Sequence, residues 1–153
     1  MNAGRRWLIA GGMLSMLAAA LHVAVVAGGP DWYRFFGAGE DMARAAERGS
    51  IMPTLVTLGI ASLLALWGAY AFSGAGLMRR LPLLRTALVA ISAIYLARGL
   101  LIVPVALFVP YPEGAFDFWS SLIVLVYGLI HALGTWRAWP AMSGSIAREH
   151  TVA

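Results

Sequence analysis

The sequence contains no cysteine and no lysine. The chain has 153 residues, and the absence of cysteine from it excludes disulfides, thiolate metal sites and thiol-based redox chemistry. All 11 basic residues are therefore arginine, and they exceed the 7 acidic residues. Only 12% of residues are charged and 61% are hydrophobic, whereas soluble domains carry about 25% charged residues. The composition predicts a membrane protein, and because the arginines flank apolar runs, they indicate membrane topology rather than nucleic-acid binding.

Four apolar stretches are long enough to cross a bilayer, which takes about 20 helical residues. They span residues 7–27, 53–73, 86–109 and 118–136. We therefore predict an all-α polytopic membrane protein, an up-and-down bundle of four transmembrane helices. Residues 1–139 would form this one transmembrane domain, and the small and polar residues 140–153 a flexible cytoplasmic tail.

Arginines are concentrated on one side of the predicted spans. They precede the first span, follow the fourth, and occur in "SGAGLMRRLPLLR" between the second and third. Cytoplasmic loops are enriched in arginine. We expect a multi-pass membrane protein with both termini in the cytoplasm.

The first span has an alternative interpretation as a cleaved signal. Its start is basic, its middle apolar, and small residues occur near Ala27, where a peptidase can cut. However, the run is long, contains His22, and its removal would leave three spans with mismatched ends. The pattern favours an uncleaved first helix.

The first outer connection is predicted to hold a short amphipathic helical segment. In "DWYRFFGAGEDMARAAERGS" the charged residues occupy one side, and Glu40 and Arg44 stand at i,i+4, a spacing that supports a surface helix. The other side carries the apolar and small residues Trp32, Phe35, Phe36, Gly39, Ala43 and Ala46. We expect one or two helices lying on the membrane interface, either as a linker that seals the bundle or as a lid.

Arg98 lies inside the third predicted span, near the bilayer midplane. An arginine at that depth costs about 2.5 to 3.5 kcal/mol on insertion scales, and no span contains Asp or Glu to pair with it. Pro104 removes a backbone donor nearby, which predicts a kink after Gly99. Arg98 can cap carbonyls, pair across a subunit interface, snorkel, or bind an anionic ligand, and Glu40 dipping inward is one candidate for the negative charge.

The remaining polar residues of the spans are histidines and tyrosines. Side chains lean toward the N-terminus of their own helix, so the end groups of Arg98 and His131 are expected to converge. Tyr95 lies one turn from Arg98 and Tyr127 one turn from His131, and the four residues are therefore predicted to form one cluster. Small and polar stripes also mark packing faces. They comprise Gly11, Ser15, Ala19 and His22 in the first span, Thr57, Ala61, Ala65, Ala69 and Ser73 in the second, and Ser120, Val124, Tyr127, His131 and Thr135 in the fourth.

Cofactor sites are disfavoured by the spacing of the two membrane histidines. A haem held by two imidazoles needs its ligands at one depth, but His22 and His131 are predicted to lie about 13 Å apart along the membrane normal. Zinc needs three or four convergent ligands, and the spans offer two. We predict neither a cofactor nor a metal site.

The stretch "GGPDWYRFFGAGEDMARAAERGS" followed by "PTLVTLGIASLLALWGAYAFSGAG" resembles small bacterial four-span inner-membrane proteins. The likeness extends from Leu21 to about Trp136 in general pattern, without a catalytic signature. It implies an integral inner-membrane location and transfers no functional residue.

Three functions are compatible with these features. The leading one is a bundle that binds a hydrophobic or anionic amphiphilic ligand, or serves as an accessory subunit, with ligand-binding candidates Arg98, His131, Tyr95, Tyr127, His22 and Glu40. A transporter or channel subunit would need further copies of the chain or a larger membrane complex as partners, besides the lipid bilayer. A lipid- or quinone-modifying enzyme would use His131 or His22 as acid or base. No catalytic residue is assigned, and the pattern favours a protein that is not an enzyme.

Overall fold

The computed structural model describes residues 3–101 and 115–149, including side chains except at 115–117 and 143–149. In these residues the chain is all-helical, without a strand. The helices are α1 (Ala3–Gly28), α2 (Pro30–Phe35), α3 (Glu40–Glu47), α4 (Met52–Gly74), α5 (Leu84–Leu100) and α7 (Ala115–Glu149).

Three of these helices are long and apolar enough to cross a membrane. They are α1, α4 and the Phe118–Met142 part of α7, and they match the first, second and fourth predicted spans. α5 has 17 residues, a length of about 25 Å, which is less than the roughly 30 Å of a hydrocarbon core. The remainder of the third predicted span, with Pro104 and its expected kink, lies outside the described residues.

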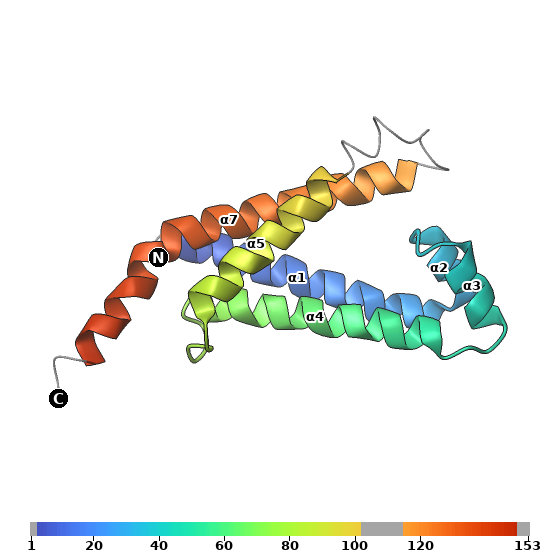
Figure 1. The fold of residues 1–153 in the computed structure, drawn as a ribbon, viewed down its shortest axis with the longest axis horizontal. Coiled ribbons are helices and arrows are strands. Elements are labelled where there is room, and N and C mark those ends of the chain that lie inside the picture. Colours follow the sequence, from blue (N-terminus) through green and yellow to red (C-terminus); the bar gives the residue numbers. More distant parts are fainter. Residues whose placement is uncertain (1–2, 102–114, 150–153) are drawn as a thin grey trace.

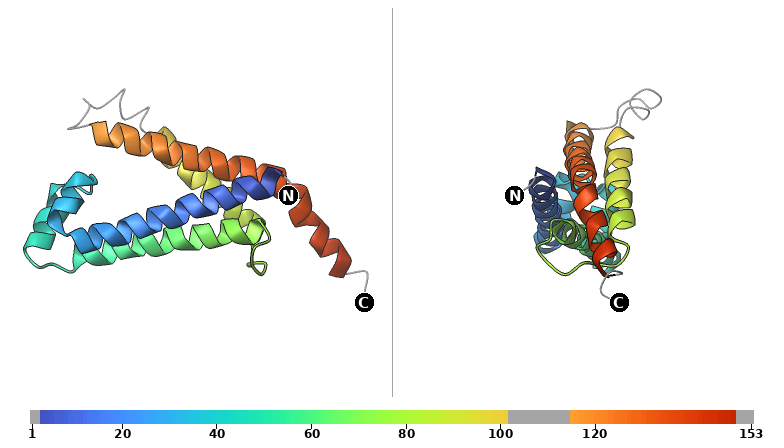
Figure 2. Two further views of the ribbon diagram at one scale, coloured as in Figure 1. Left: turned by 180° about the vertical axis from the view of Figure 1, so that it is seen from behind. Right: turned by 90° about the vertical axis from the view of Figure 1, so that its left-hand side faces the viewer.

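The long helices run in alternating directions between the two ends of the bundle, and these ends differ in composition (Figures 1 and 2). One end, called here the arginine end, holds the start of α1, the 75–83 connection and the C-terminal part of α7. The other, called the capped end, holds α2 and α3. α1 packs along both α4 and α7, and α5 packs along α7. In Figure 1 the α1–α4 pair and the α5–α7 pair diverge toward the capped end.

Glycines bring α5 and α7 into close contact. A Cβ atom at Gly99 would lie 2.6 Å from the Cα atom of Leu125, and one at Gly128 would lie 2.8 Å from the amide nitrogen of Leu96. Both contacts involve backbone of the opposite helix, which cannot turn away as a side chain can. Membrane helices commonly approach through small residues in this way, and these two glycines therefore fix the register between α5 and α7.

The cap formed by α2 and α3 differs from the predicted single apolar face. Two short helices are present, because the chain turns at Gly37 and Gly39, whose φ angles are 66° and 96°. Tyr33 is the buried aromatic of this segment at 2% exposure, whereas Phe35 is 74% exposed. The predicted apolar face was wrong because it assumed one continuous helical repeat from Trp32 to Ala46, which the turn interrupts.

α7 extends past the predicted end of the fourth span. It continues through Pro140 to Glu149, and its C-terminal part turns away from the axis of the rest (Figure 2). A proline inside a helix lacks the amide hydrogen and crowds the carbonyl four residues earlier, which produces such bends. The domain boundary at residue 140 and the flexibility of the tail stay predictions.

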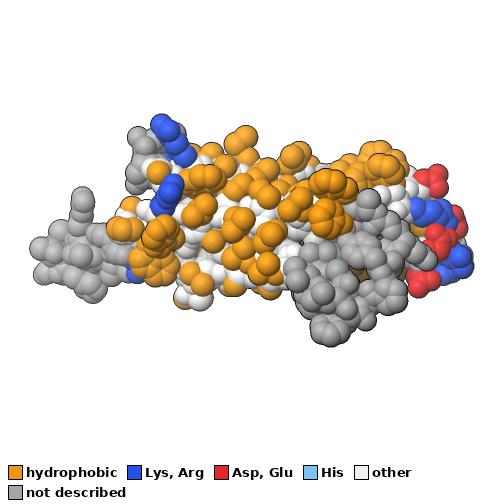
Figure 3. All heavy atoms as spheres, turned by 90° about the horizontal axis from the view of Figure 1, so that it is seen from above, with side chains coloured by type: hydrophobic (Ala, Val, Ile, Leu, Met, Phe, Trp, Pro, Cys, Tyr) orange, Lys and Arg blue, Asp and Glu red, His pale blue; other side chains and the backbone are white. Residues whose placement is uncertain are grey.

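The outer surface of the bundle is apolar between two charged ends. Hydrophobic side chains cover the flank seen in Figure 3, with arginines near one end and mixed acidic and basic side chains at the other. The exposed hydrophobic side chains of the long helices, taken over all faces of the bundle, include Leu17, Leu55, Leu66, Ile94 and Leu129. Soluble monomers rarely expose such a continuous apolar surface, and together with the three apolar helices it indicates a membrane protein.

Candidate functional site

A polar cluster is buried where the long helices meet. Ser15 of α1, Tyr95 of α5 and His131 of α7 are 0%, 4% and 0% exposed, and we call them the central polar cluster. The Ser15 hydroxyl lies 3.0 Å from the Tyr95 hydroxyl and 3.4 Å from Nε2 of His131. One serine therefore links three helices in the interior of the bundle.

The hydrogen-bond partners show which group donates and which accepts in each bond of this cluster. Nδ1 of His131 lies 2.9 Å from the carbonyl oxygen of Tyr127. A carbonyl only accepts, so Nδ1 carries the proton, and Nε2 of the neutral ring is the acceptor. The Ser15 hydroxyl then donates to Nε2, and the Tyr95 hydroxyl donates to Ser15. Each polar group of the cluster is thereby satisfied, as a buried polar network requires.

Aromatic rings enclose the cluster. The Tyr95 ring lies 5.1 Å from the His131 ring, 5.8 Å from the Tyr127 ring and 4.9 Å from the Trp67 ring, measured between centroids. The contacts with Tyr127 and Trp67 are edge-to-face, the arrangement that aromatic quadrupoles favour. α4 thus joins the other three helices around Tyr95 through Trp67.

The cluster lies at the middle of the apolar helices. Ser15 is central in α1 (Ala3–Gly28), and His131 is central in the apolar part of α7, Phe118–Met142. The predicted grouping of Tyr95, Tyr127 and His131 is therefore present. It contains Ser15 where the prediction placed Arg98.

Arg98 belongs to a separate site nearer the capped end. Its side chain is exposed, and its Nη1 donates to the Ser121 hydroxyl at 3.2 Å. Ser121 precedes His131 by about 15 Å along α7, so the expectation that Arg98 and His131 converge at one depth was wrong. The Gly99 and Gly128 contacts set the helix register, and the long Arg98 side chain extends toward the end of the span, as snorkelling side chains do.

Ser121 is the one hydrogen-bond partner of Arg98 among the described residues. A hydroxyl is neutral, and no carboxylate among the described side chains pairs with Arg98. The guanidinium has further N–H donors in a planar fork that suits carboxylate and phosphate groups.

Glu40 does not supply the missing charge. Its carboxylate accepts from Arg34 Nε and Arg44 Nε, both at 2.9 Å, so the predicted i,i+4 pair with Arg44 is confirmed and the inward contact with Arg98 is not made. These hydrogen bonds, first from Arg34 and then from Arg44, lower the pKa of Glu40 to about 2. Arg34 donates hydrogen bonds to both Glu40 and Glu47, and these bonds raise the pKa of Arg34. The carboxylates of this cap hold it together.

His22 lies apart from both groups. Its Nδ1 donates to the carbonyl oxygen of Ala18 in its own helix at 2.8 Å, and its side chain is half-buried. Among the described residues, no three His, Cys, Asp or Glu side chains come close enough to hold a metal ion.

No protein-family model, curated protein or solved structure matches this chain. The geometry of the chain itself is therefore the basis for a function.

Sequence reasoning missed two partners that complete these sites. Ser15 was placed on the packing stripe of the first span, but its position opposite His131 depends on how α1 and α7 pair. Ser121 lies beside the predicted stripe of the fourth span, which ran through Ser120 instead. A helical stripe shows that a face is packed, but the register between two helices decides which residues meet.

Proposed function

We propose that the protein is a small inner-membrane protein that binds an anionic amphiphile at Arg98. In this proposal α5 continues into a fourth span, because the apolar run 86–109 extends beyond Leu100. Both termini lie in the cytoplasm, since the arginine end carries the short-loop arginines Arg5, Arg6, Arg79, Arg80, Arg85 and Arg137.

The observation that carries the ligand proposal is the exposed guanidinium of Arg98, hydrogen-bonded to the neutral Ser121. Arg98 stands on an apolar helix beside the exposed side chains of Ile94 and Leu101. A positive group above apolar surface matches a molecule with an anionic head and a hydrocarbon chain. The head would accept from Arg98, and the chain would lie along α5.

The Arg98 guanidinium determines which anionic head groups fit the proposed site. Arginine favours planar, bidentate recognition of carboxylate or phosphate oxygens. The position of Ser121 near one end of the Phe118–Met142 segment supports a head at the interface, where anionic heads of membrane amphiphiles lie. Ser121 would orient the guanidinium and leave its other N–H groups for the ligand.

The central polar cluster supports this site in a structural role. It joins α1 to α5 and α7 at the middle of the bundle, about 15 Å from Ser121 along α7. Interhelical hydrogen bonds in membranes contribute about 0.6 kcal/mol each on average. Its contribution in this proposal is to hold α5 and α7 in the register that pairs Arg98 with Ser121.

Photo-crosslinking tests the proposal. A photoreactive amino acid at Leu101, one turn from Arg98 and 53% exposed, captures molecules at the proposed site, and one at Leu58, 38% exposed on α4, is the control position. The Leu101 position is expected to capture anionic amphiphiles above their share in the membrane, and Arg98→Leu removes that excess. Capture at Leu101 that follows the bulk lipid composition contradicts the proposal.

A further inference from the structure

The α2–α3 cap has a small core of its own. Tyr33 and Phe36 of α2 pack with Ala43 and Ala46 of α3, and Val25 of α1 is the one member of this cluster from outside the cap. The clusters that join the long helices contain no residue of the cap. Segments with a core of their own move and open as units, so the cap is able to change position without losing its shape.

The salt bridges of the cap join α2 to α3. Arg34 of α2 donates to Glu40 at 2.9 Å and to Glu47 at 2.7 Å, both in α3. Two further pairs, Arg34 with Asp31 and Arg44 with Glu40, also lie within the cap. None of these four salt bridges links the cap to a long helix. They hold the two cap helices to each other and leave the cap free to move as one body.

A glycine stands at each connection between the cap and the bundle. Gly29 precedes α2 and Gly49 follows α3, with φ angles of 73° and 75°. A Cβ atom at either position would meet nothing within 4 Å. Hinges are a few residues at the ends of elements that absorb large changes in backbone angle, and glycine does so at little cost. The two glycines therefore provide a hinge on each side of the cap.

The cap stands at the open end of the bundle without touching α5 or α7. α2 contacts α1, α3 contacts α4, and in the described part of the chain neither cap helix contacts α5 or α7. In Figures 1 and 2 the cap projects from the ends of α1 and α4 toward the side on which α5 and α7 lie. Arg98 is exposed on α5, and Phe35 of α2 is 74% exposed. The Arg98 site is thus on the side of the bundle that the cap leaves uncovered.

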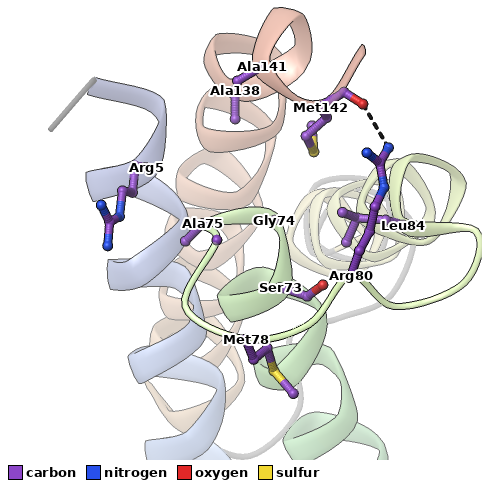
Figure 4. A pocket seen from close by; sticks show the side chains of 11 residues that line it. Arg5, Ser73, Gly74, Ala75, Met78, Arg80, Leu84, Ala138, Ala141 and Met142 are labelled. Carbon is purple, nitrogen blue, oxygen red and sulfur yellow. Dashed lines mark hydrogen bonds between the residues drawn. The ribbon is translucent and has the colours of Figure 1, made fainter. Parts of the chain in front are cut away.

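The connection at the arginine end is attached differently. Arg80 donates to the carbonyl oxygen of Met142 at 2.7 Å, a bond drawn in Figure 4, and Arg85 donates to that of Trp139 at 3.3 Å. Both carbonyls belong to α7, and Leu84 of α5 shares a core cluster with Met142. Hydrogen bonds and packing therefore fix this end to α7, whereas the cap has neither kind of link to α7 among the described residues.

The described position of the cap leaves one polar group unsatisfied. Tyr33 is 2% exposed, and its hydroxyl has no hydrogen-bond partner among the described residues. A buried hydroxyl without a partner destabilises the conformation that buries it. This cost favours movement of the cap away from its described position.

We propose that the cap is a preformed lid, which turns about Gly29 and Gly49 and closes toward α5 and α7 over an amphiphile bound at Arg98. The ligand is that of the proposed function, so this inference rests on that function. Closing covers the bound molecule and buries the exposed ring of Phe35. Lids of this kind sequester a ligand and slow its release.

Distances between spin labels test the movement in the full chain, reconstituted in phosphatidylglycerol or in phosphatidylcholine. One pair, at Asp41→Cys and Leu129→Cys, spans the cap and α7, and a control pair, at Leu66→Cys and Leu129→Cys, spans α4 and α7; all three positions are exposed. Phosphatidylglycerol is expected to shorten the cap distance and to leave the control distance unchanged. Arg98→Leu is expected to abolish the shortening.

The release of phosphatidylglycerol from the purified chain is the second measurement. Phe35→Ser removes the ring that closing buries and is expected to speed release about 5- to 30-fold. Ile51→Ser is the control, because Ile51 is also an exposed apolar residue, at 68%, but lies outside the cap. Equal release rates in the two variants contradict the lid.

Native mass spectrometry of the same samples separates the lid from the site that it would cover. If phosphatidylglycerol binds in an Arg98-dependent manner and the cap distance does not change, the lid is overturned and the amphiphile site stands. If Arg98→Leu binds phosphatidylglycerol as the parent chain does, the site and the lid both fail.

Discussion

Gly11 of α1 lies directly against the imidazole of His131. A Cβ atom at Gly11 would be 2.9 Å from Cε1 and 3.0 Å from Nδ1 of that ring. The glycine therefore provides the space in which the histidine reaches Ser15, one turn further along the same helix.

Gly11→Ala is expected to destabilise the bundle by about 1 to 3 kcal/mol, the usual cost of overpacking a filled interior. The added methyl group pushes the ring away from Ser15, whose 3.4 Å bond is already long. Gly59→Ala in α4 is the matched control, because its Cβ would meet nothing within 4 Å. Unfolding in mixed detergent micelles measures both. A loss of stability no larger than that of Gly59→Ala contradicts the close contact between Gly11 and His131.

Ser15 and Tyr95 are expected to be energetically coupled. Ser15→Ala removes both hydroxyl contacts of the central polar cluster, and Tyr95→Phe removes one. Each is expected to cost about 0.5 to 2 kcal/mol. The double variant should cost less than the sum, with a coupling of at least about 0.5 kcal/mol. Strict additivity in this double-mutant cycle would show that the hydroxyls do not interact.

Gly99→Ala is expected to separate α5 from α7 and to disturb the Arg98 site. The new Cβ would lie 2.6 Å from the Cα atom and 2.7 Å from the amide nitrogen of Leu125, so backbone has to move. The expected loss of about 2 kcal/mol or more exceeds that of the open control Gly59→Ala. Crosslinking between cysteines at positions 98 and 121 reports the register. Unchanged crosslinking and unchanged stability argue against the close contact.

The helices α1 and α4 were predictable from sequence, and the Arg98 site was not. The first predicted span, 7–27, lies within α1, and 53–73 lies within α4, because an apolar run bounded by polar residues defines a membrane helix. The sequence prediction estimated the depth of Arg98 in the membrane by counting residues from the predicted ends of the third span. This depth is set instead by Gly99 and Gly128, which pack on backbone of the opposite helix, and no single-helix pattern contains that information.

Acid is expected to loosen the α2–α3 cap. The pKa of Glu40 is lowered from 4.5 to about 2 by Arg34 and Arg44, so its carboxylate stabilises the folded cap. That contribution is complete above about pH 4.5, the value in the unfolded chain, and is lost as the pH falls toward about 2. A spin label at Ala38→Cys should become more mobile over this range.

Glu40→Gln serves as the control for that titration. The amide cannot ionise, so the label is expected to be mobile already at neutral pH and to change little on acidification. A variant that titrates like the parent chain would assign the transition to another group.

The proposed orientation is testable because the chain has no cysteine of its own. Met78→Cys in the connection between α4 and α5 and Ser50→Cys in the one between α3 and α4 are both exposed positions. A membrane-impermeant thiol reagent added to intact cells is expected to label position 50 and spare position 78. Labelling of both or of position 78 alone contradicts the proposed topology.

The most direct measurement of the central claim is the amount of anionic amphiphile retained by the gently purified chain, counted by native mass spectrometry. Arg98→Leu is compared with the parent chain and with Arg48→Leu, an exposed arginine at the same end. One retained anionic molecule should be lost, with affinity reduced at least about tenfold, in Arg98→Leu alone. Equal retention by all three proteins would contradict a binding site at Arg98.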